Sequence, residues 1–195
     1  MREIATSSVR TKRWTRLEYE RLIDLGAFAP DERLELLGGQ LIVREPQGQP
    51  HATGIRLVAR GLRAVFGLDW NIEAQLPVAL DEESEPEPDI AVVIGGPRDY
   101  IASHPSRPEL VVEVALASLA LDRGEKARLY ARAGVADYWI VNLVDNVLEV
   151  HREPVADPHG AYGWRYASVA TLRRGDSVTP LALPASAIPI SDLLP

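Results

Sequence analysis

The sequence contains no cysteine, which excludes disulfide bonds, thiolate nucleophiles and zinc sites built on cysteine. No apolar run reaches the roughly 18 residues of a membrane-spanning helix, so we expect no membrane partner. The first residues, MREIATSSVRTKRW, have no apolar segment behind their charges and do not resemble a secretory signal. These absences favour a reducing cytoplasm as the location.

Lysine is scarce as well, because 19 of the 21 basic residues are arginine. Only Lys12 and Lys126 are lysine. A lysine inside the fold then needs a reason, since its compact ammonium and shiftable pKa are properties that a guanidinium lacks.

The length of 195 residues, with 46% hydrophobic and 25% charged residues, suits a globular protein with one core. We expect a basic tail over residues 1–14 and a single domain over residues 15–195. The net charge of -7 argues against coating nucleic acid by bulk charge. Six of the nine residues from Asp81 to Asp89 are acidic, however, and basic clusters elsewhere leave room for a local groove that binds an anionic polymer.

The hydrophobic pattern predicts alternating helices and strands. Helices are expected over 15–26, over 51–66 with Arg56, Arg60 and Arg63 on one face, and over 121–135 with an end at Gly134. A hairpin is expected around Gly38-Gly39, and strands over 71–80, 89–94, 108–115, 137–143, 147–152 and 163–169. This order predicts an α/β fold, a mixed sheet with helices on its faces.

Three charged residues interrupt the apolar pattern of their segments. Asp89 lies where the acidic segment becomes a buried strand, and Glu113 has valines on both sides. Lys126 lies on the following helix, on the face of Leu129 and Tyr130. If the two strands are neighbours, the two carboxylates can enter one cleft.

Paired buried carboxylates repel each other, and a divalent cation removes that repulsion. Mg²⁺ is held by one or two carboxylates together with waters and phosphate oxygens. It polarises a phosphate and lowers the pKa of its bound water, while a nearby lysine orients or deprotonates that water. The three residues therefore suit phosphodiester hydrolysis.

Each residue also has a simpler interpretation. Asp89 could end a solvated acidic turn, and Glu113 could face water on an edge strand. Lys126 could pair with Asp122 at i, i+4 on an exposed helix face.

The segments EPEPDIAVV and PELVVEVALASLALDRGEKARLYARAGVADYWIVNL resemble the Uma-two family of restriction-endonuclease-like proteins, in the PD-(D/E)XK nuclease superfamily. ERLELLGGQLIV and PHATGIRLVARGL resemble it too, so the likeness runs from about Thr15 to about Arg152. The resemblance implies a restriction-endonuclease-like mixed β-sheet flanked by helices.

The resemblance also implies site residues. Pro88-Asp89 and Glu113 are the acidic elements, and Mg²⁺ or Mn²⁺ would be held by Asp89, Glu113 and the main-chain carbonyl of Val114. The superfamily's usual lysine position falls on Ala115, but a variant carries it on the next helix, where Lys126 fits.

The resemblance also points to Glu35 and His51 as candidate residues of the same cleft, and more weakly to Gln75. Glu35 could instead be a strand-end glutamate in an ordinary hairpin, and His51 could cap a neighbouring loop. Leu116 and Leu119 stand where polar residues are often found, so the outer part of the site departs from the pattern.

Two functions remain open. The first is a metal-dependent DNA endonuclease that acts as a homodimer, with phosphates meeting the Arg56, Arg60 and Arg63 face or the Arg123, Arg128 and Arg132 helix. The second is a non-catalytic module that binds nucleic acid or protein on a nuclease scaffold. A small-molecule phosphohydrolase is a third reading, but Gly95-Gly96 alone does not make a phosphate-binding loop.

Overall fold

The structure is a computed structural model that describes residues 11–29, 31–44 and 47–195. Residues 1–10 of the expected basic tail lie outside this description. The helices are α1 (Arg16–Asp24), α2 (Gln49–Phe66), α3 (Leu119–Leu121) and α4 (Ala127–Arg132), with a π-helical turn over Asp122–Lys126 and short 3-10 turns over Pro97–Tyr100, Ala161–Gly163 and Ile190–Asp192. The strands are β1 (Leu34–Leu37), β2 (Gln40–Val43), β3 (Trp70–Glu73), β4 (Ile90–Ile94), β5 (Leu110–Ala115), β6 (Asp137–Asn142), β7 (Val147–Ala156), β8 (Trp164–Leu172), β9 (Ser177–Val178) and β10 (Ile188–Pro189).

The main sheet has six strands in the order β3-β4-β5-β6-β7-β8. Strands β5 and β6 pair in parallel, and every other neighbouring pair is antiparallel. The predicted mixed sheet is therefore confirmed. Every residue of β5 is buried and the strand is central, so Glu113 does not face water on an edge strand, and that interpretation was wrong.

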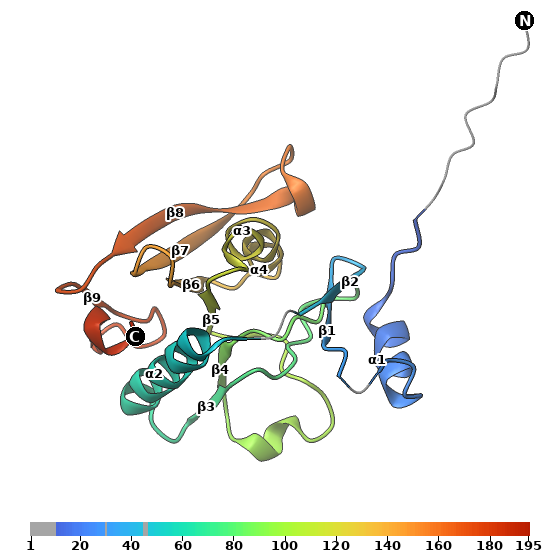
Figure 1. The fold of residues 1–195 in the computed structure, drawn as a ribbon, viewed down its shortest axis with the longest axis horizontal. Coiled ribbons are helices and arrows are strands. Elements are labelled where there is room, and N and C mark those ends of the chain that lie inside the picture. Colours follow the sequence, from blue (N-terminus) through green and yellow to red (C-terminus); the bar gives the residue numbers. More distant parts are fainter. Residues whose placement is uncertain (1–10, 30, 45–46) are drawn as a thin grey trace, which may run out of the picture.

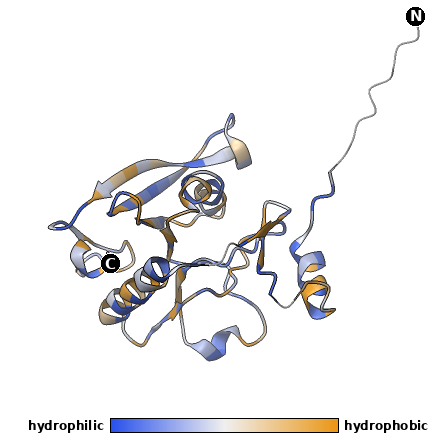
Figure 2. Cartoon of the chain, viewed as in Figure 1, coloured by the Kyte–Doolittle hydropathy of each residue, from blue (hydrophilic) through white to orange (hydrophobic). Residues whose placement is uncertain are grey.

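Helices cover both faces of this sheet (Figure 1). Helix α2 packs Val58 and Leu62 against Val112 and Val114 of β5 on one face. On the other face, Tyr130 of α4 packs in a second core. Because side chains alternate along a strand, β5 contributes to both cores, and its hydrophobic colouring in Figure 2 reflects this double burial.

The β1–β2 hairpin and α1 lie beside the main sheet (Figure 1). Thr15 caps the start of α1 and forms a capping box with Glu18. The acidic segment connects the hairpin to the sheet, because the main-chain N–H of Glu85 donates to the carbonyl of Leu36 at 2.8 Å. The segment is thus part of the packed structure rather than a fully solvated turn.

Two expected elements differ from the structure. The strand expected over 71–80 ends at Glu73, because Gln75 adopts a positive φ of 55° and Pro77 has no N–H for a ladder. The single helix expected over 121–135 is interrupted by the π-helical turn. Within the described ranges, no helix is both long and apolar enough to cross a membrane.

Candidate functional site

A cavity of about 310 Å³ opens beside the carboxyl end of β5. The hairpin, the start of α2, the residue before β4 and the π-helical turn contribute its other walls. Its lining residues are Glu35, Val43, Arg44, Gln47, Gly48, His51, Asp89, Glu113, Leu116, Ala117, Ser118, Leu121, Asp122 and Lys126.

Asp89 immediately precedes β4 and is only 3% exposed. Its Oδ2 accepts a hydrogen bond from the main-chain N–H of Val114 at 2.8 Å and lies 2.9 Å from Nε2 of His51. Among the described residues its Oδ1 has longer contacts, 3.3 Å from Nε2 of Gln75, 3.5 Å from Nε2 of Gln47 and 3.6 Å from Arg44. One oxygen of Asp89 is thus firmly held, while the other is weakly bonded.

Glu113 shows the same asymmetry. Its Oε1 accepts from the Tyr130 hydroxyl at 2.8 Å and from Nζ of Lys126 at 3.1 Å. Within the described part of the chain, its Oε2 accepts only from the main-chain N–H of Asp89, at 3.3 Å. This contact holds the Glu113 carboxylate against the main chain of Asp89, and each of the two carboxylates has one weakly bonded oxygen.

The ammonium of Lys126 lies between two carboxylates from opposite sides of the site. It is 3.1 Å from Oε1 of Glu113 and 3.1 Å from Oε2 of Glu35, which lies on β1. Lys126 ends the π-helical turn, and Asp122 begins it. Both are buried, so the interpretation of an Asp122–Lys126 pair on an exposed helix face was wrong.

Among the residues that the structure describes, four buried carboxyl groups share this cavity, from Glu35, Asp89, Glu113 and Asp122. Lys126 and Arg44 are the permanent cations in its lining. Because two fixed positive charges cannot balance four ionised acids, the site either holds protons or binds a further cation.

The pKa directions follow this imbalance. Burial raises the pKa of Glu113 to about 8 and that of Asp122 to about 6, although Lys126 opposes both shifts. Burial alone would raise the pKa of Asp89 too, but its hydrogen bond and charge interaction with His51 lower it. Burial would lower the pKa of Lys126, but the carboxylates of Glu113 and Glu35 raise it.

The residues named from the sequence thus lie together. Asp89, Glu113, Lys126, Glu35 and His51 all line the cavity, and the structure places Gln75 against Asp89. Asp89 is buried, so the interpretation of a residue ending a solvated turn was wrong. His51 contacts Asp89, and Glu35 contacts Lys126 and the N–H of Glu87.

Sequence reasoning missed Arg44, Asp122 and Tyr130 as members of the site. Arg44 gave no signal among so many arginines. Asp122 was expected only as a partner of Lys126 on an exposed helix face. That arrangement would keep its side chain out of a cavity. Tyr130 was recognised only as a neighbour of Lys126 on the same helix face.

The donor set fits a hard cation such as Mg²⁺ or Mn²⁺. Within the described part of the chain, no three His, Cys, Asp or Glu side chains are arranged to hold a metal ion by themselves. Mg²⁺ usually takes only one or two carboxylates and keeps several waters. The weakly bonded oxygens of Asp89 and Glu113 supply such a pair, whereas Val114 contacts the site through its N–H.

The arginines expected to meet phosphates fall into two groups. Those on the 123–132 helix are bound within the chain, Arg123 to Glu149, Arg128 to Asp157 and Arg132 to Asp81. Arg56 and Arg60 on α2 are exposed and, among the described residues, form no ion pair. The α2 face is therefore the better candidate for a phosphate contact.

Comparisons with known proteins agree with this fold. A solved structure, "Crystal structure of a putative nuclease belonging to DUF820 from Anabaena variabilis ATCC 29413", is similar with a TM-score of 0.68 and 16% identity, over 92% of this chain and 97% of that one. No curated protein matches the sequence. The family described as "Putative restriction endonuclease", Uma2, matches residues 17–191. The chain therefore belongs to the Uma2 family of restriction-endonuclease-like proteins.

Proposed function

We propose that the chain is a metal-dependent endonuclease that hydrolyses phosphodiester bonds of DNA. The observation that carries this proposal is the excess of buried acid in one cavity, four carboxyl groups against Lys126 and Arg44. A divalent cation together with a phosphate would complete this arrangement, because the cation balances the acids and the phosphate meets the lysine and arginine.

Asp89 and Glu113 would hold Mg²⁺ or Mn²⁺ through their weakly bonded oxygens, with the Val114 carbonyl as a proposed third ligand. When bound, the metal supplies a polarised phosphate and a water of lowered pKa. The remaining roles belong to the chain itself. The N–H of Val114 and the Tyr130 hydroxyl fix the opposite oxygens of the two carboxylates, so that their orientation is set before the substrate arrives.

We propose that Lys126 acts through the positive charge of its ammonium group rather than as a general base. Its raised pKa keeps the ammonium protonated, and its two carboxylate contacts hold it beside Glu113. From there it can orient an attacking water and stabilise charge on the phosphate. Glu35 would position this ammonium, and His51 would support Asp89.

Arg44 would meet the phosphate of the substrate. It now binds Glu87 at 2.8 Å and lies 3.6 Å from Asp89. An incoming phosphate offers the guanidinium a bidentate partner, which neither of these contacts provides.

The test is cleavage of plasmid and branched DNA in Mg²⁺ or Mn²⁺, compared with chelator and with Glu113→Gln. Metal-dependent cleavage that the variant lacks supports the proposal. Absence of cleavage on every substrate would favour the binding module, which the charge of -7 and the apolar Leu116 at the site make the main alternative. The homodimer and the cytoplasmic location stay predictions from the sequence.

A further inference from the structure

The acidic groups of the cavity lie deep, which limits the nucleic acid that can reach them. Asp89 and Glu113 are 3% and 2% exposed, and the cavity volume of about 310 Å³ is at the low end for a small-molecule site. Duplex DNA is stiff over roughly 50 nm and keeps its bases stacked and paired. A flexible single strand can bend a phosphate into such a cavity more readily than a stiff duplex can.

Part of the wall beside the acids is apolar, next to the cations Lys126 and Arg44. Leu116 and Val43 line the cavity and are 46% and 57% exposed, and Leu121 lies beside them in the lining. Aliphatic side chains can pack against the faces of bases where those faces are exposed, as they are in an unpaired strand. The composition of these walls therefore also favours an unpaired strand.

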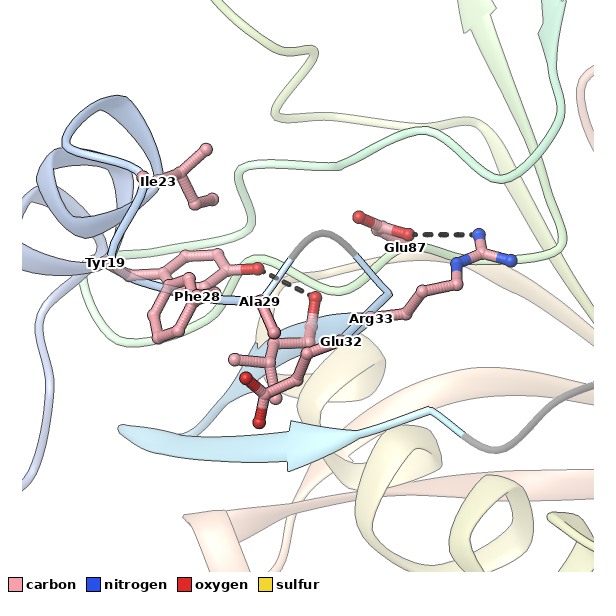
Figure 3. A pocket seen from close by; sticks show the side chains of 9 residues that line it. Tyr19, Ile23, Phe28, Ala29, Glu32, Arg33 and Glu87 are labelled. Atoms are coloured by element: carbon pink, nitrogen blue, oxygen red, sulfur yellow. Dashed lines mark hydrogen bonds and ion pairs between the residues drawn. The ribbon is translucent and has the colours of Figure 1, made fainter.

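A second hollow, also of about 310 Å³, lies between α1 and the start of β1 (Figure 3). Tyr19, Phe28 and Ile23 give it apolar walls, and Glu32 and Arg33 add polar groups. The Tyr19 hydroxyl donates to the carbonyl of Leu34 at 2.8 Å, so the polar group of this ring is already satisfied. Tyr19 is only 4% exposed and its ring centroid lies 6.1 Å from that of Phe28, so Phe28 is the aromatic side chain that this hollow offers to a nucleobase.

Glu87 connects the two hollows. It lines the second hollow, where Arg33 lies 3.6 Å from its carboxylate, and it binds Arg44 of the first at 2.8 Å. Glu87 and Asp89 are two residues apart, roughly 7 Å of extended chain. One nucleotide in a stacked strand rises about 3.4 Å, so a strand with a phosphate at Asp89 has a nearby base within reach of the second hollow.

We propose that the chain takes single-stranded DNA, with the scissile phosphate in the Asp89–Glu113 cavity and a neighbouring base in the Tyr19–Phe28 hollow. Arg44 and Arg33 would exchange Glu87 for phosphates of the bound strand. The cleavage part of this inference rests on the proposed function, whereas the preference for an unpaired strand is measurable without cleavage.

Binding is measured by fluorescence anisotropy on a labelled DNA strand, its duplex and the matching RNA strand, with chelator present. We expect the DNA strand to bind at least about ten-fold more tightly than the duplex. Phe28→Ala should weaken strand binding by about five- to a hundred-fold, the contribution of stacking one base. Leu17→Ala, at an exposed position of α1 outside the hollow, should leave it unchanged.

Phe28→Leu keeps apolar bulk without a flat ring, so it tests stacking even if Phe28→Ala unfolds. Equal or tighter binding of the duplex, a preference for RNA, or strand binding by Phe28→Leu equal to that of the native chain overturns the inference.

Cleavage in Mn²⁺ then separates this inference from the proposed function. Faster cutting of the single strand and of a duplex carrying an unpaired bulge supports both. Faster cutting of the intact duplex overturns the strand preference and leaves the nuclease standing. Selective strand binding with no metal-dependent cleavage supports the strand site and overturns the nuclease.

Discussion

The main-chain N–H of Val114 donates a 2.8 Å hydrogen bond to Oδ2 of Asp89. This bond joins the central strand β5 to the residue that precedes β4, and it fixes one oxygen of Asp89 while the other remains weakly bonded. The Val114 side chain packs on the other side, against α2 at Gly54. Packing of α2 on the sheet is thus coupled to the orientation of a candidate metal ligand.

Gly54→Ala should disturb both the fold and the site. A Cβ at Gly54 would lie 2.7 Å from Cγ1 of Val114, closer than a normal contact. We expect a loss of about 1–3 kcal/mol in the free energy of unfolding, typical of overpacking, and reduced metal-dependent cleavage. Urea denaturation and the plasmid assay measure these. Gly96→Ala, where a Cβ meets no atom within 4 Å, is the control, and equal behaviour of the two variants would contradict the coupling.

Glu113→Gln should abolish metal binding without unfolding the chain. The amide still accepts from Tyr130 but cannot give a cation a charged oxygen. We expect cleavage to fall by on the order of 100-fold, the scale of losing one transition-state contact. Calorimetric titration with Mn²⁺ should show the matching loss of affinity. Glu109→Gln, at an exposed residue just before β5, should retain both, and native metal affinity in Glu113→Gln would refute the assignment.

The fold was largely predictable because its strands are continuous apolar runs and its turns carry glycine. The hairpin at Gly38-Gly39 and the buried run around Glu113 follow directly from such patterns. The π-helical turn was not predictable, because an extra residue in a helical turn leaves no mark in the hydrophobic period. Asp122 begins this turn and Lys126 ends it, and both line the cavity.

The site was predictable where a charge interrupts an apolar segment, as at Asp89 and Glu113. Lys126 could be predicted as a site residue because lysine is rare in this chain. Arg44 could not be distinguished from other arginines, since its role depends on contacts with Glu87 and Asp89 that only the tertiary structure creates.

Lys126→Arg should lose activity although the charge is kept. The ammonium fits between Glu35 and Glu113 with two 3.1 Å contacts, and a longer planar guanidinium cannot take the same position. We expect a decrease in cleavage of at least about ten-fold. Lys126→Met should instead cost about 3–5 kcal/mol in the free energy of unfolding, because it leaves buried carboxylates unpaired. Lys12→Arg, at an exposed lysine, is the control.

If Lys126→Arg cleaves DNA as fast as the native chain does, any positive charge suffices at this position. An unchanged denaturation midpoint for Lys126→Met would show that Glu35 and Glu113 do not depend on the lysine as a counter-ion.

Glu85→Gln should remove part of the pH dependence of stability. Glu85 is buried where the acidic segment meets the hairpin, and burial, reinforced by Glu20, raises its pKa from the ordinary value of 4.5 to about 7. Between pH 4.5 and 7 the unfolded chain has released a proton that the folded chain still holds. The free energy of unfolding therefore falls as the pH rises through this window and levels off above it.

Glutamine mimics the protonated acid at every pH, so the variant should match the native chain near pH 4.5. Near pH 8 it should be more stable by on the order of 1–3 kcal/mol. Urea denaturation at the two pH values measures the difference, with the exposed Glu82→Gln as the control. Because Glu113 and Asp122 also have raised pKa values, both proteins should keep a residual slope in the same direction. A variant that loses stability at pH 8 would show that Arg16, which lies 4.0 Å away, stabilises the ionised Glu85 by more than burial destabilises it.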